Sequence, residues 1–170
     1  SNKLTLFVAA GLQKPMDVII EGFKKETNAE VTVNYAASGA LYTQMQVGQP
    51  CDLYFSADWI YIDKVKQDNL LDTSYKFLND NVVLIVSKSA ASKVTSANDL
   101  VKSGVTVAVA VDEAPIGAYS VNALKKLGIW DQLNTSGNLK ARPATVNQVA
   151  LMVQQDQVDA GLVYSSTAHG

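Results

Sequence analysis

The sequence predicts an α/β fold made of two lobes, each a mostly parallel β-sheet covered by helices. Strand-like and helix-like segments alternate almost to the end of the 170 residues. The alternation is interrupted near Phe77–Asn81 and then starts again with a new apolar strand. Hydrophobic residues make up 48% of the chain, which is enough for a substantial core. We therefore expect a first lobe over residues 1–79 and a second over 80–170.

The first lobe is expected to contain three strands and three helices. Apolar residues with helical spacing predict the first helix: Leu12, Met16, Ile19, Ile20 and Phe23. Alternating apolar residues predict the second strand, and Gly48 with Pro50 ends the second helix. The expected strands are 3–10, 30–36 and 51–57, and the expected helices are 12–27, 39–48 and 58–69.

The second lobe begins with the apolar run NVVLIVSK, which is typical of a buried strand. The alternation that follows predicts strands at 81–88, 105–111, 138–143 and 158–165, with helices at 97–104, 116–130 and 146–156. The two halves show no sequence repeat.

Composition excludes several classes of function. The formal net charge is −2 and charged residues make up 18% of the chain, so there is no basic field to attract nucleic acid. Cys51 is the single cysteine, so the chain cannot form an internal disulfide. No apolar run approaches the roughly 18 residues of a membrane span. The cellular compartment cannot be read from these features.

Turns of small residues lie where strands are expected to end and helices to begin. They are AAGL after the first strand, AASGAL after the second, DEAPIGAY after VTVAVAV, and RPATVNQV after NLKARP. Ligands of open parallel sheets bind beyond the carboxyl ends of the strands. The unpaired N–H groups of a helix start can bind an anion without any cationic side chain. These turns are therefore candidate anion-binding positions.

The residues alone leave two interpretations of each turn. Ser38 could be a helix N-cap, or its hydroxyl could contact an anion. Gly11 could serve a tight turn, and Pro115 before Ile116 suits a purely structural helix start. Arg142 and Lys14 are the cations near the helix starts, and a solvated surface role is expected for both.

A catalytic function has little support. The single histidine, His169, is one residue from the end of the chain, and Cys51 has no histidine nearby in sequence. The sequence contains no nucleophile elbow, Walker loop or dinucleotide fingerprint. One histidine and one cysteine make a zinc site improbable. We expect a protein that is not an enzyme and has no cofactor and no direct metal ligands.

Four segments resemble the periplasmic molybdate-binding proteins, the substrate-binding subunits of molybdate and tungstate ABC importers. The segments are Leu6–Leu12, Tyr35–Asp58, Pro115–Trp130 and Val146–Ala168. The resemblance covers nearly the whole chain. It implies a type II periplasmic binding protein-like fold, with two α/β lobes and an interlobe cleft that closes around a tetrahedral oxyanion.

The resemblance also implies a ligand-binding set of uncharged donors. Carried over by position, these are Gly11, Ser38, the backbone N–H groups of Ile116 and Val146, and the Tyr164 phenol. Gly11 stands where the family commonly has a serine, and Ile116 where a small residue such as alanine is usual. Family members also continue past the segment that ends here at Gly170, so a return segment to the first lobe is expected to be absent.

The expected function is capture of molybdate or tungstate for an ABC importer, with no chemical reaction. The expected partners are the small oxyanion and the membrane permease, without nucleic acid, and the protein is expected to act as a monomer. It would be periplasmic or extracellular, free or tethered by a lipid anchor in its precursor. Two alternatives stay open. One is binding of sulfate, phosphate, chromate or a small organic anion, and the other is an effector-binding sensory domain of the same fold.

Overall fold

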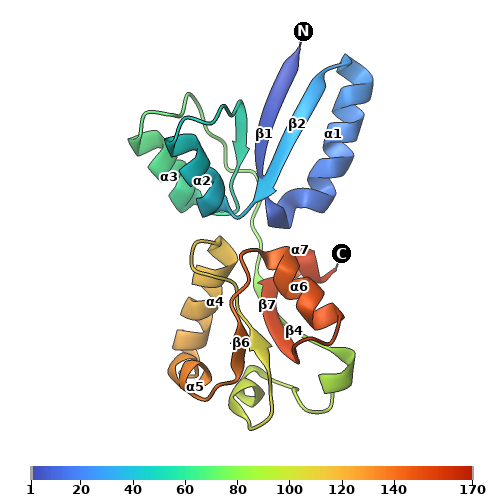
Figure 1. Ribbon diagram of the computed structural model, residues 1–170, viewed down its shortest axis with the longest axis vertical. Coiled ribbons are helices and arrows are strands. Elements are labelled where there is room, and N and C mark those ends of the chain that lie inside the picture. The colour runs from blue at the N-terminus through green and yellow to red at the C-terminus, as the bar shows by residue number, and fades with distance from the viewer. Residues whose placement is uncertain (1, 170) are drawn as a thin grey trace. The chain divides into compact units, whose positions relative to one another are not determined.

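The computed structural model describes residues 2–169 and divides the chain into two compact units, Ser1–Leu78 and Asn79–Gly170. Each unit is an α/β structure with its own sheet and its own core (Figure 1). No helix among the described residues is long and apolar enough to cross a membrane.

The first unit is built on a three-stranded parallel sheet with the order β2-β1-β3. Its strands are β1 (Lys3–Ala9), β2 (Glu30–Ala36) and β3 (Leu53–Phe55). Its helices are the short 3-10 helix η1 (Ala10–Leu12), α1 (Gln13–Thr27), α2 (Ser38–Gln46) and α3 (Trp59–Gln67). All three predicted helices and all three predicted strands are present.

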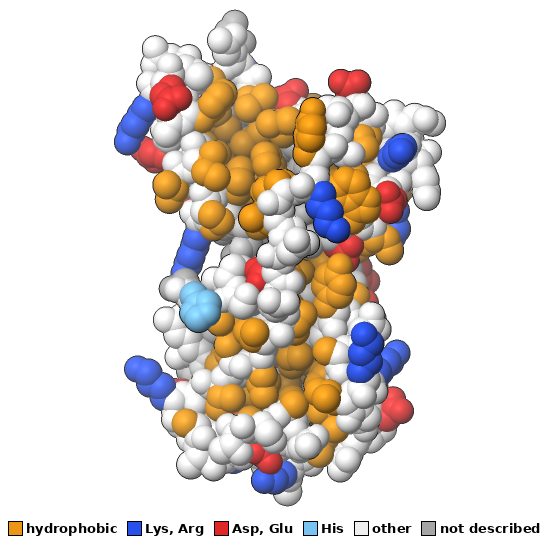
Figure 2. Space-filling view, turned by 180° about the vertical axis from the view of Figure 1, so that it is seen from behind, with side chains coloured by type: hydrophobic (Ala, Val, Ile, Leu, Met, Phe, Trp, Pro, Cys, Tyr) orange, Lys and Arg blue, Asp and Glu red, His pale blue; other side chains and the backbone are white. Residues whose placement is uncertain are grey.

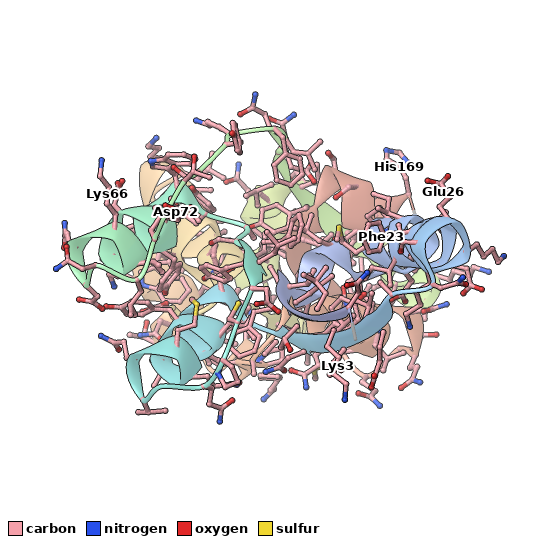
Figure 3. The ribbon with its side chains drawn as sticks, turned by 90° about the horizontal axis from the view of Figure 1, so that it is seen from above. Lys3, Phe23, Glu26, Lys66, Asp72 and His169 are labelled. Carbon is pink, nitrogen blue, oxygen red and sulfur yellow. The ribbon has the colours of Figure 1, made fainter. Side chains whose placement is uncertain are left out.

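Alternation along β1 explains why helices cover both faces of this sheet. Leu6 and Val8 pack against Met16 and Ile20 of α1. Phe7 points to the other face and packs in a cluster with residues of α2 and α3. Accordingly, α1 lies on one side of the sheet and α2 and α3 on the other (Figure 1). Seen from above, Phe23 of α1 and Lys66 of α3 mark these two sides (Figure 3).

The second unit has a four-stranded sheet with the order β4-β7-β5-β6. β5 is parallel to β6 and β7, whereas β4 is antiparallel to β7. The strands are β4 (Val82–Val86), β5 (Val107–Ala108), β6 (Leu139–Ala141) and β7 (Ala160–Tyr164). The helices are η2 (Lys88–Ala90), η3 (Ala97–Val101), α4 (Pro115–Lys126), α5 (Trp130–Thr135), α6 (Val146–Gln154) and α7 (Ser165–Ala168).

Three predictions for the second unit were wrong in detail. The predicted helix 116–130 ends at Lys126 because Gly128 takes a left-handed conformation, with φ +73°, and a separate α5 follows. The predicted helix 97–104 is a shorter 3-10 helix. The predicted strand 105–111 contributes only two residues to β5, although Val109 and Val111 still donate backbone hydrogen bonds beyond it, to Ala141 and Pro143.

Candidate functional site

The predicted site residues of the first unit lie at one edge of its sheet. β1 and β2 are parallel and in register, with Ala9 opposite Ala36. Gly11 and Ser38 each lie two residues beyond those paired ends, at the carboxyl edge. Gly11 is in η1 and can offer only its backbone, whereas Ser38 is the first residue of α2.

Ser38 is not a helix cap. Ala37 occupies the N-cap position of α2, and no side chain caps that helix. The N-cap interpretation is therefore wrong. The Ser38 side chain is fully buried, and its Oγ accepts a hydrogen bond of 3.0 Å from the backbone N–H of Ala57. The Ser38 hydroxyl also lies within hydrogen-bonding reach of the Tyr54 phenol, and a hydroxyl can rotate its proton from that oxygen to a ligand.

Two further groups hold the start of α2 in place. The phenol of Tyr54, on β3, donates a hydrogen bond of 2.7 Å to the Ser38 carbonyl. Burial raises the pKa of Tyr54 above its usual value, so this phenol remains a donor at neutral pH. The first backbone bond of α2 runs from the Leu41 N–H to the Ala37 carbonyl. The N–H groups ahead of Leu41 therefore have no acceptor within the helix.

In the second unit, the Ile116 N–H in the first turn of α4 has no acceptor among the described residues. Pro115 has no N–H, and the N–H groups of Gly117 and Ala118 both bond to the Ala114 carbonyl, at 2.8 and 3.3 Å. The Ile116 side chain is buried, with 2% of its surface exposed. This side chain stands where the resembled family usually has a small residue, and the core accommodates it.

Val146 begins α6 directly after a capping box. Thr145 Oγ1 accepts from the Gln148 N–H, and the Gln148 side chain accepts from the Thr145 N–H. The capping box is satisfied by these two residues, and no acceptor for the Val146 N–H lies among the described residues. An anion could accept this bond at the positive end of the helix.

Tyr164 is the last residue of β7, and its hydroxyl is buried. Because β5, β6 and β7 are mutually parallel, their carboxyl ends lie at one edge of the sheet. α4 follows β5, α6 follows β6, and Tyr164 ends β7. The structure thus brings Ile116, Val146 and Tyr164 to the same edge of the second unit.

Arg142 is exposed, as the sequence suggested, and its guanidinium is also bound to the chain. Its Nε lies 3.0 Å from the Val109 carbonyl oxygen, and its Nη2 lies 3.0 Å from that of Ala110. Nη2 also pairs with Asp112 at 2.6 Å, and the guanidinium lies 5.4 Å from the centre of the Trp130 ring. The guanidinium is thus bound to the connection between β5 and α4. Lys14 is exposed, as expected.

No group of three or more histidine, cysteine, aspartate or glutamate residues suited to a metal lies within residues 2–169. Burial raises the pKa of the Cys51 thiol, which makes its thiolate form scarce at neutral pH. His169 follows α7 and is exposed, and Figure 3 shows its side chain projecting away from the ribbon.

Sequence reasoning missed the groups that support the predicted donors. The Ala57 N–H, the Tyr54 phenol and Arg142 act across long sequence separations, and no local pattern marks such pairings. Gly117 was the one detectable signal, since a glycine inside a helix pattern often marks a close backbone approach.

Comparison with known proteins identifies the protein family to which this chain belongs. The family model described as bacterial extracellular solute-binding protein matches residues 4–170, and the chain belongs to that family. The type II periplasmic binding protein-like fold expected from the resemblance is confirmed.

Relatives within this class are named for molybdate. The molybdate-binding protein ModA of Escherichia coli (strain K12) is 32% identical over 176 residues, covering 98% of this chain and 67% of that protein. ModA of Mycobacterium tuberculosis (strain ATCC 25618 / H37Rv) is 32% identical over 171 residues, covering 99% of this chain and 63% of that protein. The chain therefore spans about two thirds of the length of these relatives.

A solved structure supports the fold. The periplasmic molybdate-binding protein of Azotobacter vinelandii superimposes with a TM-score of 0.83 at 22% identity, covering 95% of this chain and 71% of that one. At that identity the likeness establishes the fold and leaves the ligand to be argued from the site.

Proposed function

We propose that this protein captures molybdate or tungstate outside the cytoplasm and delivers it to the permease of an ABC importer. The observation that carries the proposal is the pair of backbone N–H groups of Ile116 and Val146, which lie in the first turns of α4 and α6, are buried, and have no acceptor among residues 2–169. A buried donor without an acceptor costs free energy unless a ligand satisfies it. The relatives named for molybdate support the choice of ligand.

The proposed donors are Ser38, the N–H groups of Ile116 and Val146, the Tyr164 phenol and the backbone at Gly11. A hydrogen bond to a charged group contributes about 1.5–3 kcal/mol. Micromolar binding requires about 8 kcal/mol, so four or five such donors suffice after the cost of desolvating the anion.

Uncharged donors favour selection by geometry. A lysine would attract any anion, whereas N–H and O–H groups held by the fold discriminate by size and by the directions of the oxygen atoms. The proposal therefore places no lysine or arginine against the anion and predicts weak binding of the smaller sulfate ion. Capture requires no chemical step, so the protein is proposed to act as a monomeric, periplasmic binding protein and not as an enzyme.

Isothermal titration calorimetry tests the ligand. We expect one molybdate or tungstate per chain, with sulfate and phosphate bound at least tenfold more weakly under the same conditions. Thermal-shift competition with sulfate, phosphate, chromate and small organic anions shows whether the protein binds one of these anions in preference to molybdate. Heat with sulfate but none with molybdate or tungstate would overturn the choice of ligand, and no heat with any oxyanion would overturn anion capture.

A further inference from the structure

The connection between β5 and α4 determines where the Ile116 N–H lies. Ala114 is the N-cap of α4, and its N–H donates a hydrogen bond of 3.1 Å to the Val111 carbonyl. The Ala114 carbonyl in turn accepts from Gly117 and Ala118 in the first turn of the helix. A shift of the backbone at Val111 would therefore move the start of α4.

Arg142, the residue after β6, donates hydrogen bonds to this connection. Its Nε lies 3.0 Å from the Val109 oxygen and 3.2 Å from the Ala110 oxygen, and its Nη2 lies 3.0 Å from the Ala110 oxygen. The Val111 N–H also donates to the Pro143 carbonyl at 3.0 Å, next to Arg142 in the chain. A planar guanidinium can donate hydrogen bonds to two successive carbonyl oxygens at once. The compact ammonium group of lysine cannot reproduce this geometry.

Gly117 allows the same backbone to approach α4. A Cβ atom at Gly117 would lie 1.9 Å from the Val111 oxygen and 2.5 Å from the Ala110 oxygen. Both are backbone atoms, so a side chain at this position would force the helix and the connection apart. The Ala110 carbonyl is thus in contact with Arg142 and would also meet any side chain at position 117.

We propose that Arg142 and Gly117 are positioning residues that hold the Ile116 N–H in the direction needed to bind the anion. This inference rests on the proposed function and deepens it. Neither residue is proposed to touch the anion, since the arginine donates to the carbonyls of the connection and to Asp112. A fixed donor binds an anion better than a mobile one because less conformational entropy is lost on binding.

Binding measurements on Arg142→Met and Lys140→Met provide the first test. Each substitution removes one positive charge, but Lys140 is an exposed residue two positions away with no part in the connection. We expect Arg142→Met to raise the Kd for molybdate at least tenfold and Lys140→Met to raise it less than threefold. Arg142→Lys should behave like Arg142→Met, because charge alone does not restore the paired contacts.

Amide hydrogen exchange of the unliganded protein provides a readout that does not depend on the ligand. We expect the Arg142→Met protein to exchange the amides of 110–118 at least tenfold faster than the wild type. The amide of Val149, in the middle of α6, should be unchanged in the same sample. Since Gly117→Ala could prevent folding altogether, the conclusion depends on the arginine variants.

The outcomes separate this inference from the proposed function. If the wild type binds molybdate and Arg142→Met binds it within threefold, the positioning role is wrong and the proposed function stands. If the wild type binds no oxyanion, the proposed function fails, and the exchange data alone decide whether Arg142 orders the connection. Unchanged exchange over 110–118 in the folded variant would overturn the inference in either case.

Discussion

At the scale of single residues, the buried Ser38 joins two parts of the first unit. Its Oγ accepts from the Ala57 N–H, which follows β3, while its own backbone begins α2. Removal of the hydroxyl would leave the Ala57 N–H without its partner, so Ser38 contributes to stability as well as to the proposed site.

Substitution Ser38→Ala should therefore lower both affinity and stability. We expect the Kd for molybdate to rise at least tenfold, because a charge-assisted hydrogen bond is lost. The free energy of unfolding should fall by about 1–3 kcal/mol, which is the usual cost of an unsatisfied buried donor. Calorimetry with molybdate and chemical denaturation of the unliganded protein measure the two effects.

Substitution Tyr54→Phe is the matched control for Ser38. It removes the 2.7 Å bond to the Ser38 carbonyl and leaves the Ser38 hydroxyl intact. A similar loss of stability with affinity within threefold of the wild type is expected. If Ser38→Ala also leaves the affinity within threefold, then Ser38 has a structural role only.

At the scale of secondary-structure elements, the 3-10 helix η3 begins with a capping box that depends on the Asp99 carboxylate. One oxygen of Asp99 accepts from the N–H and hydroxyl of Thr95, at 2.8 and 2.9 Å, and from the Ser96 N–H at 3.2 Å. The other oxygen pairs with Lys102 at 2.6 Å. The Lys102 ammonium, followed by the bonds from Thr95, holds the pKa of Asp99 well below its usual value.

The cap predicts a specific dependence of stability on pH. Because the folded-state pKa of Asp99 lies below the unfolded value of about 3.9, its stabilisation is present above that value and is lost as the pH falls further. Asp99→Asn should lower the melting temperature at pH 7, and the difference from the wild type should shrink below about pH 4. Thermal denaturation followed by circular dichroism from pH 7 to pH 2 measures this.

Asp72→Asn is the control for the acid dependence, because Asp72 is an exposed carboxylate of the first unit, labelled in Figure 3. Its melting temperature should follow that of the wild type at every pH. A gap between wild type and Asp99→Asn that stays constant down to pH 2 would contradict the role assigned to the Asp99 charge.

At the scale of the whole molecule, the two units differ in how well they bury their apolar residues. The second unit contains a large buried cluster that includes Leu100, Val107 and Leu133, and Val149 and Val163 are fully buried outside it. The first unit has two smaller clusters on opposite faces of its sheet. It also exposes large apolar side chains, including Val18, Ile19, Tyr75 and Phe77. Figure 2 shows hydrophobic side chains gathered over this unit on the face in view.

The two units are therefore expected to differ in thermal stability when each is expressed alone. Residues 79–170 should show a cooperative thermal transition, whereas residues 1–78 should unfold at a lower temperature or aggregate, since exposed apolar surface favours association. A transition temperature for residues 1–78 at or above that of residues 79–170 would contradict this expectation.

The sequence by itself determined the order and type of most elements, because apolar periodicity and breakers such as Gly48 and Pro50 act over neighbouring residues. It also placed Gly11, Ser38, Ile116, Val146 and Tyr164 at strand ends or helix starts. Only the tertiary structure decided that Ser38 Oγ accepts from Ala57, that Arg142 binds the β5–α4 connection, and that Gly117 contacts backbone carbonyls. Each of these depends on distances between residues far apart along the chain, or between backbone segments that only packing brings together, and local propensity does not encode such distances.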